Sequence, residues 1–112
     1  MTQPGFQTLL KLLREGNVYV KLSRINGVSR RGPDYADAVP IARALIKANP
    51  SRMLWGTDWP HPQPVQGYET TDVSPFLAID DGRAFNQFVV WAPEAAIRRT
   101  ILVDNPARLY GF

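Results

Sequence analysis

Apolar side chains recur along the chain with two different periods, and these periods predict its first helix and its first strand. In residues 3–15 the apolar positions are three or four apart, which is typical of an amphipathic helix; they are Phe6, Leu9, Leu10 and Leu13. Residues 17–23 alternate with a period of two, which is typical of a strand whose apolar face carries Val18, Val20 and Leu22. The chain therefore opens with a helix followed by a strand.

The same two periods return in the middle of the chain. Residues 34–49 have helical spacing, with a short first turn and a new start near Pro40, because proline fits poorly inside a helix. Residues 53–55 form a short apolar run between turn residues, which is typical of a buried strand. A strand, a helix and a second strand predict a parallel pair, which brings Ser23 and Asp58 to the same end of the sheet. The predicted fold class is therefore α/β.

The last third of the chain is predicted to be helical after one long irregular segment. Residues 63–81 show no regular period, and loops of this length are usually either functional or disordered. If this segment lies at the carboxyl ends of the strands, it is expected to cover a substrate. Helices are expected over residues 83–91 and 93–102. A final helix is predicted to start with Asn105 as its N-cap and Pro106 in its first turn.

Composition excludes several classes of site. The 112 residues include no cysteine, so there is neither a disulfide framework nor a cysteine-based metal site. The net charge of +3 comes from 13 basic and 10 acidic residues spread along the chain, whereas a nucleic-acid site needs basic residues gathered on one face. No apolar run approaches the ~20 residues that span a membrane, and no leader segment is expected. We expect one small cytoplasmic domain with neither nucleic acid nor membrane as partner.

Asp58 is the strongest candidate for chemistry, because this carboxylate follows directly after the predicted buried strand. Pro60 and Pro62 prevent the strand from continuing, since proline lacks the N–H group and fixes φ. In α/β barrels, chemistry is placed at this carboxyl end of the strands. An aspartate in such a position can also simply cap a turn through its side-chain oxygen. The local sequence leaves both interpretations open.

Two other kinds of polar side chain fall near Asp58 in the predicted fold. The loop over residues 24–33 carries Arg24, Arg30 and Arg31. A guanidinium group can hold a carboxylate through two parallel hydrogen bonds, although loop arginines are more often simply solvated. His61 is the only histidine. Between two prolines it is predicted to be a turn residue with a solvent or backbone partner, and metal binding or proton transfer stays open.

Three segments together resemble the amidohydrolase-2 (amidohydrolase-related) family, most closely its 2-pyrone-4,6-dicarboxylate lactonase type. One is Gly56-Thr57-Asp58-Trp59-Pro60-His61-Pro62, which is similar to the motif of the family's last barrel strand. The others are residues 27–40 and residues 103–110, and the order and separation of all three agree with the family. The resemblance covers nearly the whole chain but only the C-terminal third or so of the family's barrel.

The resemblance implies a partial (β/α)8 TIM barrel, in which residues 1–112 supply the last two parallel strands and their flanking helices. It implies that Asp58 is the general base that activates water at a lactone or ester carbonyl. It also implies that Arg30 holds a carboxylate of a small substrate, whereas Arg31 is outside the match and is expected on the surface. In metal-dependent relatives the matching aspartate binds a divalent metal such as zinc, so Asp58 is the candidate ligand if a metal is used.

Features that the chain lacks also affect the expected function. The family draws its electrophile from histidines on earlier strands, including a His-x-His, and this chain has one histidine. Two parallel strands cannot close an eight-stranded barrel, so the isolated chain is expected to be inactive. It is expected to be a truncated chain, a partial gene product, or a piece that assembles with the missing N-terminal barrel portion. The alternative is a non-catalytic assembly or binding module, whose open sheet edge and apolar helix faces dock onto a partner chain.

Overall fold

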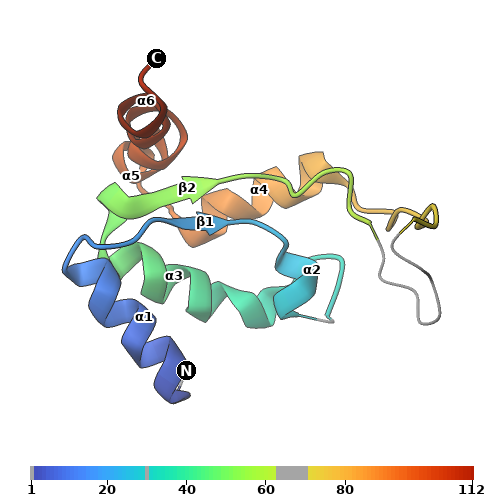
Figure 1. Cartoon of the computed structure of the whole chain (residues 1–112), viewed down its shortest axis with the longest axis horizontal. Helices are drawn as coiled ribbons and strands as arrows, with labels where there is room; N and C mark the ends of the chain where they lie inside the picture. Colours follow the sequence, from blue (N-terminus) through green and yellow to red (C-terminus); the bar gives the residue numbers. More distant parts are fainter. Residues whose placement is uncertain (1, 30, 63–70) are drawn as a thin grey trace.

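A two-stranded parallel sheet forms the centre of the computed structural model, which describes residues 2–29, 31–62 and 71–112. Strand β1 (Val20–Leu22) pairs with β2 (Met53–Trp55), and helix α3 (Val39–Ala48) connects the two. The register places Val20 beside Met53 and Leu22 beside Trp55. The predicted α/β class and parallel pairing are confirmed, and the loops that follow both strands leave the sheet at the same end (Figure 1).

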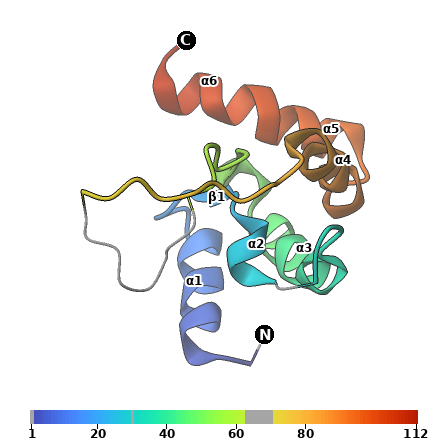
Figure 2. The same cartoon turned by 90° about the vertical axis from the view of Figure 1, so that its right-hand side faces the viewer.

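The helices form an arc around one face of the strand pair, as Figure 2 shows. The arc runs from α1 (Pro4–Arg14) through α3 and α4 (Asp81–Trp91) to α6 (Asn105–Tyr110). Among the described residues, no helix covers the opposite face of the sheet. The shorter elements are α2 (Ile25–Val28), α5 (Ala95–Arg99), the 3₁₀ turns η1 (Ala36–Ala38) and η2 (Pro50–Arg52), and the π-helical turn η3 (Thr100–Asp104). None of the described helices has both the length and the apolarity needed to cross a membrane.

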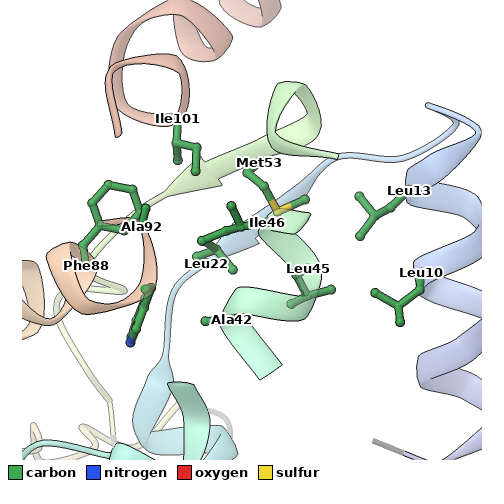
Figure 3. Packing of buried hydrophobic residues seen from close by; sticks show 11 residues of the cluster. Leu10, Leu13, Leu22, Ala42, Leu45, Ile46, Met53, Phe88, Ala92 and Ile101 are labelled. Atoms are coloured by element: carbon green, nitrogen blue, oxygen red, sulfur yellow. The ribbon is translucent and has the colours of Figure 1, made fainter. Parts of the chain in front are cut away.

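The buried core lies between the sheet and this arc of helices (Figure 3). The predicted apolar faces of α1 and α3 are confirmed, because α1 buries Leu10 and Leu13 while α3 buries Leu45 and Ile46. Removing such side chains from water contributes about 1.5–3 kcal/mol each to stability. The other members of the cluster are Leu22, Ala42, Met53, Phe88, Trp91, Ala92 and Ile101.

Several element boundaries differ from the sequence prediction. Strand β1 is shorter than the predicted 17–23, because β2 offers only three residues for it to pair with. The predicted loop 24–33 contains the short helix α2. Helix α4 begins two residues before the predicted start at Arg83, because the Asp80 carboxylate caps it by accepting a hydrogen bond from the Arg83 amide at 2.9 Å. The new helix start predicted near Pro40 is confirmed, since α3 begins at Val39.

Asn105 has a different role from the predicted N-cap. The turn η3 leads directly into α6, so there is no free helix start for the side chain to cap. Asn105 is instead fully buried, and its Nδ2 donates hydrogen bonds of 2.7 Å to the carbonyl oxygens of Pro50 and Met53. The N-cap prediction is therefore wrong, and Asn105 joins the C-terminal helices to the start of β2.

Candidate functional site

Asp58 lies directly beyond the carboxyl end of β2, in a turn whose backbone is left-handed at this residue (φ 71°). This conformation costs most residues about 1–2 kcal/mol, and aspartate is among the few that adopt it. The hydroxyl oxygen of Thr57 accepts a hydrogen bond from the Trp59 amide at 3.1 Å, and the Asp58 carbonyl oxygen accepts one from the His61 amide at 3.1 Å. These hydrogen bonds hold the backbone of the turn, and the Asp58 side chain on it is 32% exposed.

Arg24 faces Asp58 from the loop that follows β1. Its Nε lies 3.9 Å from Oδ2 of Asp58, and its own backbone is also left-handed (φ 50°). At this distance and with Arg24 58% exposed, the pair contributes little to stability. It nevertheless confirms the expectation that the loops after both strands meet at one end of the sheet. Sequence reasoning placed Arg24 in this region but gave the substrate-binding role to Arg30.

Arg30 itself lies outside the described residues. On either side of it the chain is held by polar contacts, because the Ser29 hydroxyl donates to Oδ1 of Asp37 at 2.5 Å and accepts from the Arg31 amide at 3.0 Å. Ser29 is buried, whereas Arg31 is exposed. The prediction that Arg31 lies on the surface is thus confirmed, and the role predicted for Arg30 stays a prediction.

The His61 side chain is buried, with only 4% of its surface exposed. Its Nε2 lies 2.8 Å from Oδ1 of Asp81, the first residue of α4. The predicted turn is confirmed by a left-handed backbone (φ 56°), but the predicted solvent or backbone partner of the side chain is wrong. The local sequence could not show this contact, since Asp81 is 20 residues away and reaches His61 only when the start of α4 packs back against the turn.

The first turn of α4 holds both loops at this end of the sheet. Asp81 binds His61 in the turn after β2, and Arg83 binds Asp34 in the loop after β1, with Nη2 and Nε at 2.6 and 2.8 Å from the same carboxylate oxygen. Sequence reasoning missed Asp81 and Arg83 as supporting residues. The available signal was the pair of adjacent acidic residues at the start of a predicted helix.

A shallow pocket lies beside the arginine-bearing loop. It has a volume of about 300 Å³ and is lined on one side by Ser29 and Tyr35 and on the other by the segment 77–79. Small-molecule sites start at about this volume. The pocket thus opens between the loop after β1 and the segment that leads into α4, next to the turn that carries Asp58.

Asp58 is the residue expected from the sequence to bind a metal if one is used, and that role stays a prediction. His61, which belongs to the same motif as Asp58, already directs its Nε2 to Asp81. Within residues 2–29, 31–62 and 71–112, no three histidine, aspartate or glutamate side chains gather into a possible metal site. Since a catalytic zinc takes three protein ligands, these residues do not make a complete centre, and further ligands would have to come from outside the described ranges.

Asp58 and Arg24 meet at the carboxyl ends of the two parallel strands, which is where (β/α)8-barrel enzymes carry their active sites. The Amidohydrolase family model matches residues 1–112, and the chain belongs to this family. The resemblance inferred from the three sequence segments is therefore confirmed.

Two curated relatives and one solved structure resemble the chain over nearly its full length. It is 44% identical over 109 residues to 4-sulfomuconolactone hydrolase of Hydrogenophaga intermedia, covering 97% of this chain and 33% of that protein. It is 40% identical over 114 residues to 2-pyrone-4,6-dicarboxylate hydrolase of Comamonas testosteroni, covering 94% and 34%. The apo crystal structure of an Agrobacterium tumefaciens protein matches with a TM-score of 0.73 at 32% identity, covering 99% and 36%. The chain thus spans about a third of the length of its curated relatives.

Proposed function

We propose that the chain is the C-terminal part of a lactone hydrolase in which Asp58 is the general base. The observation that carries this proposal is the partly exposed Asp58 carboxylate, held beyond the end of β2 and facing Arg24 of the loop after β1. The relatives named 4-sulfomuconolactone hydrolase and 2-pyrone-4,6-dicarboxylate hydrolase support a lactone substrate that carries anionic groups.

In this proposal, residues 1–112 form the last two strands of a (β/α)8 barrel together with their helices. The parallel pairing of β1 and β2 through α3 supports it. The face of the sheet that no described helix covers also supports it, because Lys21 and Leu54 are paired in register on this face and alternate with residues of the core cluster. In a barrel this face looks inward, and the other strands would belong to the two thirds of the relatives that this chain does not cover.

The proposed reaction needs a base, a group that orients the substrate and a group that stabilises the developing oxyanion. The Asp58 carboxylate takes a proton from water, and the water oxygen attacks the lactone carbonyl. The ring C–O bond then breaks, and the proton passes from Asp58 to the leaving oxygen. Arg30 holds a carboxylate of the substrate through its planar guanidinium group. The oxyanion-stabilising group would come from the part of the barrel outside this chain.

A test of Asp58 requires a whole barrel. Joining this chain behind the N-terminal two thirds of the Hydrogenophaga intermedia hydrolase gives what we call the completed enzyme. In the completed enzyme, Asp58→Asn is expected to lower kcat for 4-sulfomuconolactone by about 10²-fold or more, because the amide cannot take the proton from water. Loss of lactone absorbance measures the rate. Unchanged turnover would remove Asp58 from the mechanism.

Arg30 and Arg31 provide a matched pair of variants for the substrate-binding role. Arg30→Met is expected to raise KM for carboxylated lactones by about tenfold or more, with a smaller effect on kcat, because the substrate carboxylate no longer receives charge-assisted hydrogen bonds. Arg31→Met removes the same charge from the exposed neighbouring position and is expected to leave KM unchanged. Equal losses on uncharged esters would count against a carboxylate-binding role for Arg30.

A non-catalytic assembly module is the second candidate function. It is favoured by apolar side chains on α4 that stay 43%, 49% and 44% exposed, namely Phe85, Val89 and Val90. Exposed apolar side chains that gather on one helix often mark a protein-binding surface. Mixing this chain with the N-terminal two thirds of the relative as a separate chain distinguishes the candidates. Hydrogen-exchange protection of α4 with lactone hydrolysis supports the enzyme, and protection without hydrolysis supports the module.

A further inference from the structure

His61 is the one buried titratable side chain in the part of the chain that the structure describes. Its Nε2 is 2.8 Å from Oδ1 of Asp81, and its Nδ1 is buried without a hydrogen-bonding partner among the described residues. An ionised carboxylate only accepts hydrogen bonds, so this contact requires the hydrogen to be on Nε2. The ring is therefore a donor held against the first residue of α4.

The backbone of His61 is bonded on both sides. Its amide donates to the Asp58 carbonyl oxygen at 3.1 Å, and its own carbonyl oxygen accepts from the Leu77 amide at 2.9 Å. Residues 58–61 thus form a closed turn, tied to the segment that leads into α4. A left-handed backbone at both Asp58 and His61 persists only where the surrounding contacts enforce it.

Helix α4 is a rigid support for this turn. It is fixed in the core by Phe88 and Trp91, which are 1% and 6% exposed. By contrast, Trp59 in the middle of the turn is 73% exposed and contributes little packing of its own. The bond between His61 and Asp81 is therefore a side-chain contact that joins the turn to an element fixed in the core.

We propose that His61 is a positioning residue for Asp58: its hydrogen bond to Asp81 anchors the turn that directs the Asp58 carboxylate toward the attacking water. The proposal rests on the proposed function, in which Asp58 is the base, and it adds a residue that does not touch the substrate. The second link from α4, between Arg83 and Asp34, is 48% and 55% exposed and is screened by solvent, so the buried His61 link is the stronger of the two.

The central experiment compares two substitutions of His61 in the completed enzyme. His61→Leu replaces the ring by an apolar side chain of similar size and so removes the hydrogen-bond donor. A misplacement of about 1 Å costs about 10²-fold in rate, so kcat is expected to fall by about 10- to 100-fold while KM changes by less than about twofold. His61→Gln restores an N–H donor near the Nε2 position and is expected to recover kcat to within about fivefold of the parent.

Asp81 provides an independent test of the same link. Asp81→Ala is expected to lower kcat as much as His61→Leu does. The double variant is expected to lose no more than either single variant, because both changes break one hydrogen bond. Arg99→Gln serves as the control, since it breaks an exposed ion pair with Asp104 at 3.6 Å in the C-terminal helices and is expected to leave kcat unchanged.

Three outcomes would overturn the proposal: parental kcat in His61→Leu, no recovery in His61→Gln, or additive losses in the double variant. If His61→Leu does not fold, Asp81→Ala decides alone, because its carboxylate is 34% exposed and its removal leaves the core intact. Parental kcat in that variant would overturn the positioning role. Asp58→Asn separates this from failure of the proposed function, since full activity there removes the base assignment whatever His61 does.

Discussion

The two ends of the strand pair are built in opposite ways (Figure 1). At the end where the strands begin, Asn105 is fully buried and donates two hydrogen bonds of 2.7 Å to the carbonyl oxygens of Pro50 and Met53. At the end where the strands finish, Asp58 and Arg24 have left-handed backbones and are 32% and 58% exposed. At the first end a buried polar side chain has its hydrogen bonds, which makes this the closed end of the sheet. At the other end two partly exposed side chains stand on strained, left-handed backbone.

Elementary energetics explains why the two ends differ. A buried polar group stabilises the fold only when it is paired, so the Asn105 end contributes stability. A left-handed aspartate costs free energy and is retained where its carboxylate has to be presented to solvent or to a ligand. Replacing Asn105 and replacing Asp58 are therefore expected to change the free energy of unfolding with opposite signs.

The largest effect on stability is expected from Asn105→Ala. The change leaves the buried carbonyl oxygens of Pro50 and Met53 without their donor, and each such loss costs about 1–3 kcal/mol. We expect the free energy of unfolding of the completed enzyme to fall by about 3 kcal/mol, measured by urea denaturation with tryptophan fluorescence.

Asn86 on α4 is the matched control for Asn105, because it is the same residue type in an exposed position. Asn86→Ala is expected to change the free energy of unfolding by less than about 0.5 kcal/mol. Equal effects of the two substitutions would show that the strand-beginning end is no more tightly held than an ordinary helix surface.

At the opposite end, Asp58→Gly is expected to stabilise the completed enzyme while abolishing its turnover. Glycine adopts a φ of 71° without steric cost, and the ion pair with Arg24 that the change removes is weak. The free energy of unfolding should therefore rise by up to about 1 kcal/mol, as the same denaturation measurement can check. A decrease of more than about 1 kcal/mol would mean that the carboxylate supports the fold, and the contrast between the ends would disappear.

The contrast between the ends also shows which parts of the molecule the sequence could predict. Strand pairing and the place of Asp58 follow from local patterns, because the apolar run 53–55 is short and prolines end it. The contact between His61 and Asp81 joins residues 20 positions apart across an irregular segment, and no periodicity encodes such a contact. The pair Asn105-Pro106 is compatible both with a side chain that caps a helix and with one that enters the core. The structure distinguishes these two roles, because η3 continues directly into α6 and leaves no helix start to cap.

A smaller effect is expected from the exposed link between Arg83 and Asp34 at the strand-finishing end. Arg83→Gln breaks an ion pair whose partners are 48% and 55% exposed, so it should lower the free energy of unfolding by about 0.5 kcal/mol. The decrease should shrink further in about 1 M salt, which screens exposed charges. A salt-independent decrease above about 1 kcal/mol would show that this link holds the loop as firmly as the buried contacts do.

The smallest effect concerns ionisation of Tyr19 at the strand-beginning end. Partial burial raises the pKa of Tyr19, but hydrogen bonds and charge from Arg108 and Arg52 outweigh this and leave the pKa below its ordinary value of 10.0. Arg52 lies against the tyrosine, with its guanidinium carbon 4.8 Å from the ring centroid. Because the folded-state pKa is lowered, the stability contributed by this ionisation is fully present above pH 10.0 and is lost as the pH falls through the folded pKa.

At pH values well below the folded-state pKa, the tyrosine is protonated in both the folded and the unfolded state, so its ionisation contributes nothing there. Titration of the completed enzyme, followed by tyrosinate absorbance, is expected to show an early step below pH 10.0 that disappears in Tyr19→Phe. The same step should move to higher pH in Arg52→Gln, since a stabilising positive charge is removed. A step that stays unchanged in Arg52→Gln would mean that Arg52 does not act on the tyrosine, and a step that persists in Tyr19→Phe would mean that it does not come from Tyr19.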